Sequence, residues 1–169
     1  MSTLAIRKIG DPVLKQKCKP VEKIDAKVKK LIVDMLDTLY AAPGVGLAAN
    51  QVGVPLQLFV MDLQIERKKQ PFVLINPSLK EAKGKLYEEE GCLSLPGIHA
   101  KVKRNKLVKM EAINHEGMPI VIEGEGLLAR VLQHEYDHLQ GKTFVDHLSF
   151  WQKARIKAEI KKRKKEGSW

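Results

Sequence analysis

The most regular alternation of apolar and polar positions lies near the start of the chain. Apolar side chains recur every three or four residues within residues 26–41, at Val28, Leu31, Ile32, Met35, Leu36, Leu39 and Tyr40. This spacing is typical of a helix that buries one face. Asp25 can cap the first turn, because its carboxylate accepts hydrogen bonds from free backbone N–H groups. Pro43-Gly44-Val45-Gly46 then breaks the pattern. The sequence therefore predicts a helix from Asp25 to about Ala41, followed by a loop.

The middle of the chain carries short apolar runs that are typical of strands. These runs are Gln57–Leu63, Phe72–Ile75, Lys106–Asn114 and Ile120–Ile122. His115-Glu116-Gly117 supplies a turn between the last two runs. A run of short strands that follows one helix and precedes others is typical of an α+β fold with mainly antiparallel pairing.

Two more helices are indicated in the last third of the chain. Helical spacing recurs at Leu127, Leu128, Val131, Leu132 and Leu139, between Gly124 and Gly126 on one side and Gly141 on the other. Ser149 with Gln152 forms a capping box for a last helix that ends near Gly167. We therefore predict an α+β fold of one domain, residues 1–169. Mainly antiparallel strands pack around the helix near residue 134, with an N-terminal helix and a basic C-terminal helix at 148–169.

The strongest chemical signal is His134-Glu135-Tyr136-Asp137-His138. Residues four apart stack on one face of a helix, so both imidazoles can reach a single metal ion while Glu135 lies beside it. The alternative is a solvated helix with two surface histidines. We favour a metal site.

A third protein ligand decides what such a metal can do. The downstream candidates are Asp146, His147, Glu159 and Glu166, of which the last two lie in the basic C-terminal segment. Upstream, Cys92 lies within Glu90-Gly91-Cys92-Leu93-Ser94-Leu95-Pro96, on an irregular or strand-end segment. A lone cysteine of this kind is often only a packed residue. Next to a helix with two histidines, its thiolate is a strong ligand candidate.

Three segments together resemble the signature motifs of peptide deformylases of the bacterial type. They are Gly44-Val45-Gly46-Leu47-Ala48-Ala49-Asn50-Gln51, then Glu90 to Pro96, then His134 to His138, and the similarity extends over nearly the whole chain. The resemblance implies a hydrolase that removes the formyl group from N-formylmethionine of nascent polypeptides and releases formate. It also implies one divalent metal ion held by Cys92, His134 and His138. That ion is typically Fe²⁺, which Zn²⁺, Ni²⁺ or Co²⁺ can replace.

The same resemblance assigns roles to further residues. Glu135 becomes the acid and base, while the Gln51 side chain and the backbone N–H of Leu93 stabilise the oxyanion. The substrate-binding residues become Val45, Gly46, Gly91, Leu127 and Val131. Val45, Leu127 and Val131 line an apolar pocket for the methionine side chain, although plain core packing is the alternative for each taken singly. Glu90 tied to Arg104 supports the metal ligands. The chain departs from relatives at His99, Glu88 and Arg130, which affects the expected peptide preference.

The charge of the chain is concentrated at its C-terminal end. The net charge is +10 and the pI about 9.6, and residues 149–169 hold eight Lys and Arg against two Glu. Such a helix can follow RNA phosphates, or it can merely aid solubility. Resemblance to deformylases favours docking beside the ribosomal exit tunnel.

The remaining features of the sequence indicate the compartment in which the protein works. No apolar run approaches the length of a membrane span, and the first ten residues lack the apolar core of a secretory signal. Cys18 and Cys92 are too few for a disulfide framework, so we expect a cytoplasmic protein with Cys18 as a small buried apolar residue. We also expect a monomer. Two rival functions remain. A zinc endopeptidase would need a third ligand downstream of His138, and a non-enzymatic RNA-binding protein would hold a closed structural metal.

Overall fold

The computed structural model describes residues 2–65 and 68–169. The predicted domain of residues 1–169 includes residues 1, 66 and 67, which lie outside the described residues. The helices are α1 (Ala26–Ala41), α2 (Leu127–Leu139) and α3 (Phe150–Lys165). The strands are β1 (Gly46–Ala48), β2 (Leu58–Met61), β3 (Phe72–Lys83), β4 (Leu86–Cys92), β5 (Leu95–Arg104), β6 (Leu107–Ile113) and β7 (Pro119–Glu125). Short 3-10 turns include η1 (Pro12–Lys15), η2 (Ala49–Val52) and η4 (Phe144–His147).

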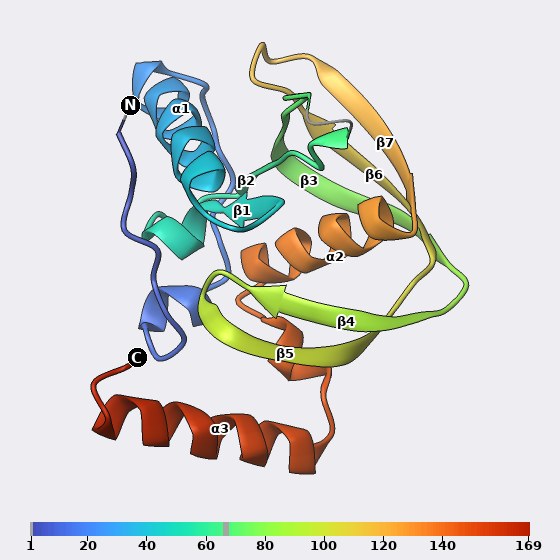
Figure 1. Ribbon diagram of the computed structural model, residues 1–169. Helices are drawn as coiled ribbons and strands as arrows, with labels where there is room; N and C mark the ends of the chain where they lie inside the picture. The colour runs from blue at the N-terminus through green and yellow to red at the C-terminus, as the bar shows by residue number, and fades with distance from the viewer. Residues whose placement is uncertain (1, 66–67) are drawn as a thin grey trace.

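Two antiparallel sheets enclose α2. Strands β1-β2-β3-β6-β7 form one sheet in that order, and β4 pairs with β5 in the other. In Figure 1, α2 crosses the middle of the molecule, with the β4–β5 hairpin below it and the larger sheet behind and above. The predicted α+β fold, with mainly antiparallel strands around a central helix, is confirmed.

The central helix α2 is buried on more than one side. Its apolar residues Ala129, Val131, Leu132 and Leu139 pack with residues of the larger sheet, among them Phe59, Leu74 and Met110. Its other buried residues are polar: Gln133, Glu135 and His138. Gln133 hydrogen-bonds the backbone of Asn105 through both ends of its amide, so its burial is satisfied by that contact. Glu135 and His138 lie on the side of α2 that carries the candidate chemistry.

The two outer helices cover other parts of the molecule. Helix α1 packs on β2 through residues such as Met35 and Leu39, and Asp25 caps its first turn by accepting a hydrogen bond from Val28 N at 2.9 Å. Helix α3 has no fully buried residue, yet its Ile156 and Ile160 pack against the cluster beneath β5. No helix among the described residues is both long enough and apolar enough to cross a membrane.

The hairpin β4–β5 is absent from our sequence prediction, which placed Glu90 to Pro96 on an irregular or strand-end segment. Strand β4 contains Glu88-Glu89-Glu90 and shows no apolar alternation, because the face it turns to α2 carries Glu90 and Cys92. The predicted loop after α1 also proves shorter than expected. Its end forms β1 and η2, whose residues are buried. Strand β3 runs to Lys83, well beyond the predicted Ile75.

Gly141, just after α2, tests how tightly this helix is held. Its φ is +72°, and a Cβ there would lie 2.5 Å from the backbone oxygen of Lys15. Gly141→Ala should lower the free energy of unfolding for two reasons. Alanine is penalised in the left-handed backbone conformation, and overpacking against Lys15 costs roughly 1–3 kcal/mol more. Gly167→Ala is the matched control, since φ is +70° there and nothing lies within 4 Å. Urea denaturation should show a clearly larger loss for Gly141→Ala, and equal losses would contradict this packing.

Candidate metal centre

The two histidines of α2 point toward the β4–β5 hairpin. His138 is fully buried, and the His134 ring lies 5.0 Å from it between centroids. His134 Nδ1 donates to Glu90 Oε2 at 2.9 Å. A carboxylate can only accept, so this hydrogen bond places the proton on Nδ1 and leaves Nε2 with a free lone pair. The helix and the hairpin together therefore orient His134 as a candidate metal ligand.

Cys92 brings a sulfur to the same place from the end of β4. Its Sγ lies 3.3 Å from His138 Nε2. Ligand atoms of Cys92, His134 and His138 all lie within 4.8 Å of one another, and this is the one such group in residues 2–65 and 68–169. Three protein donors leave a coordination position open, which is the arrangement of a catalytic rather than a closed structural site.

The donor set fits a divalent transition metal. In a tetrahedral site with metal–sulfur and metal–nitrogen bonds of about 2.3 and 2.0 Å, sulfur and nitrogen lie about 3.5 Å apart. The 3.3 Å between Cys92 Sγ and His138 Nε2 is close to that value. Burial alone would raise the pKa of the Cys92 thiol, but the neighbouring imidazoles, His138 above all, lower it well below its ordinary value when they are protonated. The thiolate, which is the form that binds metals, is thus favoured.

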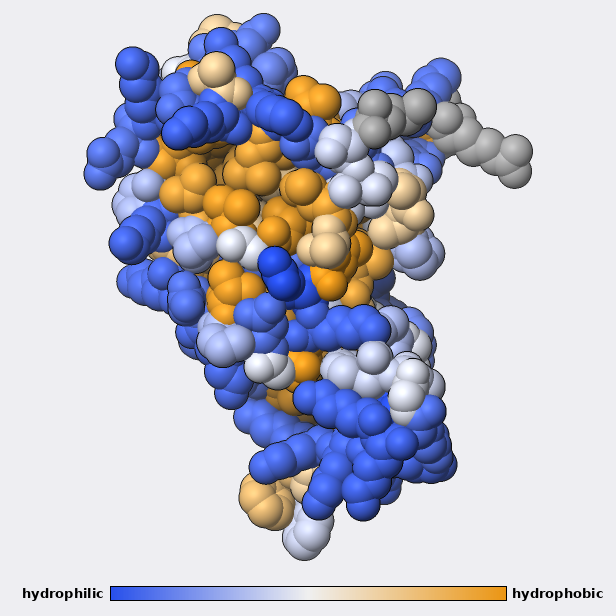
Figure 2. All heavy atoms as spheres, turned by 90° about the vertical axis from the view of Figure 1, so that its left-hand side faces the viewer, coloured by the Kyte–Doolittle hydropathy of each residue, from blue (hydrophilic) through white to orange (hydrophobic). Residues whose placement is uncertain are grey.

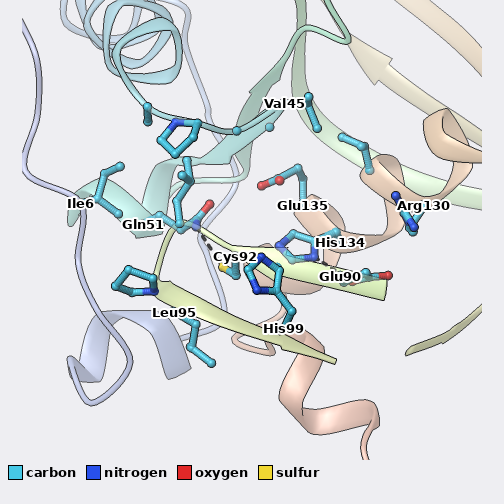
Figure 3. Close-up of a pocket in the computed structure, with 18 of the residues that line it drawn as sticks. Ile6, Val45, Gln51, Glu90, Cys92, Leu95, His99, Arg130, His134 and Glu135 are labelled. Atoms are coloured by element: carbon cyan, nitrogen blue, oxygen red, sulfur yellow. Dashed lines mark hydrogen bonds and ion pairs between the residues drawn. The ribbon is translucent and has the colours of Figure 1, made fainter. Parts of the chain in front are cut away.

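Glu135 lies beside the three donors, and Figure 3 shows its carboxylate pointing into the cavity. The residue is 4% exposed, and its Oε2 has no hydrogen-bond partner among the described residues. Burial raises the pKa of this carboxyl, against the lowering effect of the two histidines. A Cβ on Gly46 would overlap the Glu135 side chain, so glycine is required where β1 passes the carboxylate.

Gln51 approaches Cys92 from η2. Its Oε1 accepts a hydrogen bond from Ala48 N at 2.9 Å, which holds the amide against its own turn. Its Nε2 donates to Cys92 Sγ at 3.5 Å and to Ser94 Oγ at 3.1 Å, and the first of these contacts is drawn in Figure 3. Leu93, the residue after Cys92, lines the same cavity. Gln51 and Leu93 thus lie on the side of Cys92 that faces the cavity.

These residues line a cavity of about 700 Å³. The predicted substrate-binding residues all contribute to its wall: Val45, Gly46, Gly91, Leu127 and Val131. The cavity also extends past Ile6, Ala42 and Pro43, which sequence reasoning missed, because no pattern connects the N-terminal segment with the metal motifs.

The positions at which we expected the chain to depart from its relatives lie on β4, β5 and α2. Arg130 lines the cavity, and its Nη1 donates to the backbone oxygen of Glu89 at 3.1 Å. His99 is exposed and lies against Gly91, where a Cβ would come within 2.6 Å of the ring. Glu88 is exposed on β4.

Glu90 and Arg104 form a buried ion pair behind His134. Arg104 Nε and Nη2 donate to the two oxygens of Glu90 at 2.8 and 3.0 Å, and both side chains are 3% exposed. Burial would raise the pKa of Glu90, but hydrogen bonds from His134 and Arg104 lower it to about 2. Arg104 Nη1 also donates to Asp137 Oδ2 at 2.5 Å, a contact that sequence reasoning missed. The sequence signal for this contact was the spacing of Asp137, which lies three residues after His134 and therefore on the same face of α2.

The downstream ligand candidates lie outside the group of donors. Asp146 Oδ2 accepts a hydrogen bond from Thr143 N at 2.8 Å and so caps η4. His147 Nε2 donates to Asp137 at 2.6 Å. Cys18 and Cys92 are both free thiols, and Cys18 is 3% exposed within the apolar core.

A sequence model of the family described as polypeptide deformylase matches residues 3–154. The chain belongs to the polypeptide deformylase family. The peptide deformylase of Saccharophagus degradans is 46% identical over 169 residues, which cover 99% of this chain and 98% of that protein.

Solved structures of deformylases are similar in fold to this chain. A crystal structure of the enzyme from Legionella pneumophila has a TM-score of 0.92 at 42% identity, covering 99% of this chain and 98% of that one. The Ehrlichia chaffeensis deformylase in complex with actinonin has a TM-score of 0.91 at 36% identity, covering 96% and 98%. The resemblance inferred from the three motifs is confirmed, and the deformylase family does not support the zinc endopeptidase alternative. Deformylases are metalloenzymes, in keeping with the group of donors described above.

Glu90 makes the fold sensitive to acid. Its folded pKa of about 2 lies below the ordinary 4.5, so its contribution to stability is complete above pH 4.5 and is lost as the pH falls toward 2. The unfolding free energies of the metal-free parent and of Glu90→Gln should differ most near neutral pH and converge as the pH falls from 4.5 toward 2. Glu88→Gln, an exposed change on the same strand, should show no such convergence in urea titrations. A constant difference for Glu90→Gln would contradict the assignment.

Proposed function

We propose that this chain removes the formyl group from N-formylmethionyl peptides, with one divalent cation held by Cys92, His134 and His138. The observation that carries this proposal is the convergence of one sulfur and two imidazole nitrogens within 4.8 Å, beside a buried carboxylate in a cavity. We propose Fe²⁺ as the ion, with Zn²⁺, Ni²⁺ or Co²⁺ able to replace it, since imidazole and thiolate ligands suit all of these metals. When bound, such an ion polarises a carbonyl and lowers the pKa of water.

Glu135 is the proton carrier in this proposal. Its carboxylate points into the cavity (Figure 3), and its Oε2 has no partner among the described residues, so this group can accept a proton from the attacking water. The C–N bond of the formamide then breaks, and the same carboxyl gives that proton to the departing amine. Formate and a peptide with a free N-terminus are the products. Burial raises the pKa of Glu135, which makes the protonated form easier to reach during the cycle.

Gln51 and Leu93 stabilise the oxyanion that forms when water adds to the formyl carbon. Gln51 Nε2 donates to Cys92 Sγ at the wall of the cavity. Leu93, whose backbone N–H is the second donor, is the next residue after Cys92 and lines the same cavity. A single such donor is typically worth about 2.7–4 kcal/mol of the barrier. Glu90 and Arg104 support this site from behind by holding His134 Nδ1.

The close approach of β1 to Glu135 supports a preference for formyl over larger acyl groups. β1 passes so close to Glu135 that even a methyl group on Gly46 would overlap it. The formyl group carries only hydrogen on its carbonyl carbon and fits this narrow part. The methionine side chain lies along Val45, Leu127 and Val131, and Gly46 and Gly91 allow the peptide backbone to come close.

Glu135→Gln tests the proton carrier. The amide cannot accept a proton, so formate release from a formyl-Met peptide should fall by about 10²–10⁴-fold, while the metal content per chain should stay the same. Anaerobic formate assays with elemental analysis of the same sample measure both. Glu116→Gln, an identical change in the exposed turn before β7, is the control and should keep full activity. Substantial turnover by Glu135→Gln would remove Glu135 from this role.

We also propose that α3 docks the enzyme near the ribosomal exit tunnel. Its inner residues Ile156 and Ile160 pack on the body, so its lysines are free to face a partner. The lower end of the face shown in Figure 2, where α3 lies, is covered mainly by hydrophilic side chains. Phe150 and Trp151 are 75% and 80% exposed beside these charges. Exposed aromatic rings next to cations suit contact with RNA bases and phosphates.

Reversing three exposed charges of α3 tests the docking. Lys161→Glu, Lys162→Glu and Lys165→Glu in one chain should weaken ribosome binding strongly, because each lysine lost removes phosphate contacts. Formate release from a short peptide should remain unchanged. Reversal of Lys23, Lys27 and Lys29 near α1 changes the net charge equally and is the control. Equal ribosome affinity of the two triple variants at physiological salt, measured by cosedimentation, would contradict docking through α3.

A further inference from the structure

We propose that Asp137 and His147 are positioning residues for the metal ligand His134, acting through Arg104 and Glu90. The inference rests on the proposed metal site, and it gives a role to His147, a residue that lies outside the group of ligands. None of these four residues supplies a ligand atom to the group of three donors. Their effect on the metal would therefore be exerted through His134.

The first link is the shared carboxylate of Glu90. Its Oε2 accepts one hydrogen bond from His134 Nδ1 at 2.9 Å and another from Arg104 Nη2 at 3.0 Å. Its Oε1 accepts a third from Arg104 Nε at 2.8 Å. The position of Glu90, and with it the direction of the His134 ring, thus depends on where the guanidinium of Arg104 lies.

The second link fixes that guanidinium from the other side. Arg104 Nη1 donates to Asp137 Oδ2 at 2.5 Å. Asp137 lies on α2 three residues after His134, so the contacts close a ring from α2 to β4, to β5 and back to α2. Without Asp137, Arg104 would be held by Glu90 alone and could rotate about that pair. The ring therefore restricts both the angle and the distance at which Glu90 meets His134.

The third link is His147, at the end of η4. Its Nε2 lies 2.6 Å from Asp137 Oδ2, and because a carboxylate only accepts, this nitrogen carries the hydrogen. Arg104 Nη1 and His147 Nε2 lie 3.2 Å apart and both donate to the same oxygen. The His147 side chain is 34% exposed, whereas Arg104 is 3% exposed. His147 is thus the outer end of a network that begins at the metal ligand.

The expected size of the effect follows from the position of each residue in this network. Loss of a direct hydrogen-bond partner of a metal-bound histidine typically costs about 10–100-fold in metal affinity. Glu90 is such a partner, and His147 acts three contacts further out. We therefore expect His147→Phe, which keeps a ring but removes the donor, to weaken metal binding by roughly 3–10-fold, at the lower end of that range or below it.

A double-mutant cycle tests the coupling. The dissociation constant and visible absorption spectrum of bound Co²⁺ are measured on the full chain, prepared metal-free and reloaded, for the parent, His147→Phe, Glu90→Gln and the double variant. His147→Phe should weaken Co²⁺ binding and shift the spectrum in the parent, and should have no further effect in the Glu90→Gln background. The same factor in both backgrounds, or no change in the parent, would overturn the proposal.

A rescue variant separates positioning from simple loss of stability. His147→Gln retains an N–H that can reach Asp137, so its Co²⁺ affinity should return to within about twofold of the parent, even if thermal unfolding of the metal-free protein shows it to be less stable. An affinity as low as that of His147→Phe would count against positioning. If the double variant does not fold, the comparison of these two single variants, with Asp137→Asn expected to bind Co²⁺ at least as weakly as His147→Phe, decides the question.

Failure of this inference can be told from failure of the proposed function. Co²⁺ affinity is measured without substrate, so the coupling can be present in a chain that releases no formate. Conversely, the parent could release formate fully while the two substitutions change the Co²⁺ affinity additively. That result would leave the proposed function standing and would show that His147 and Asp137 do not position His134.

Discussion

The structure depends on bringing one sulfur from a strand and two nitrogens from a helix to the same point. Cys92 lies at the end of β4, and His134 and His138 lie on α2, so no local pattern can place them together. Helix α2 must therefore lie between the two sheets, and the polar face of the β4–β5 hairpin must pack against α2. The larger sheet supplies the apolar support, through residues such as Phe59 and Met110. Cys92, His134 and His138 meet because the whole fold holds α2 in that position.

The same constraint explains the number of buried charges. Glu90, Arg104 and Glu135 lie at or below 7% exposure, which is costly unless each charge is paired. Glu90 and Arg104 are paired with each other, with His134 and with Asp137. Glu135 is the exception, since one of its oxygens has no partner within the described residues. The other buried carboxylates, Glu90 and Asp62, accept hydrogen bonds, whereas Glu135 is left toward a cavity. This difference supports the proposed role of Glu135 in proton transfer.

Much of this arrangement can be predicted from the sequence where the signal is local. The helical spacing after Asp25 and before Gly141 predicted α1 and α2 closely, because both helices bury an apolar stripe that repeats every three or four residues. Strand β4 escaped prediction because Glu90 and Cys92 occupy its inward positions, where apolar residues would normally mark a strand. The contact of Asp137 with Arg104 and His147 was also missed, since Arg104 lies 33 residues before Asp137 and 43 residues before His147. Residues used for chemistry are thus the ones that disturb the patterns from which folds are read.

We propose that a cysteine sulfur and two imidazoles bind one catalytic cation. X-ray absorption fine structure at the edge of the bound metal, on protein purified without oxygen, measures this most directly. We expect one sulfur neighbour at about 2.3 Å and the remaining neighbours as nitrogen or oxygen near 2.0–2.2 Å. The sulfur neighbour should vanish in Cys92→Ala and persist in Cys18→Ala. A metal shell of nitrogen and oxygen alone in the parent protein would exclude Cys92 as a ligand.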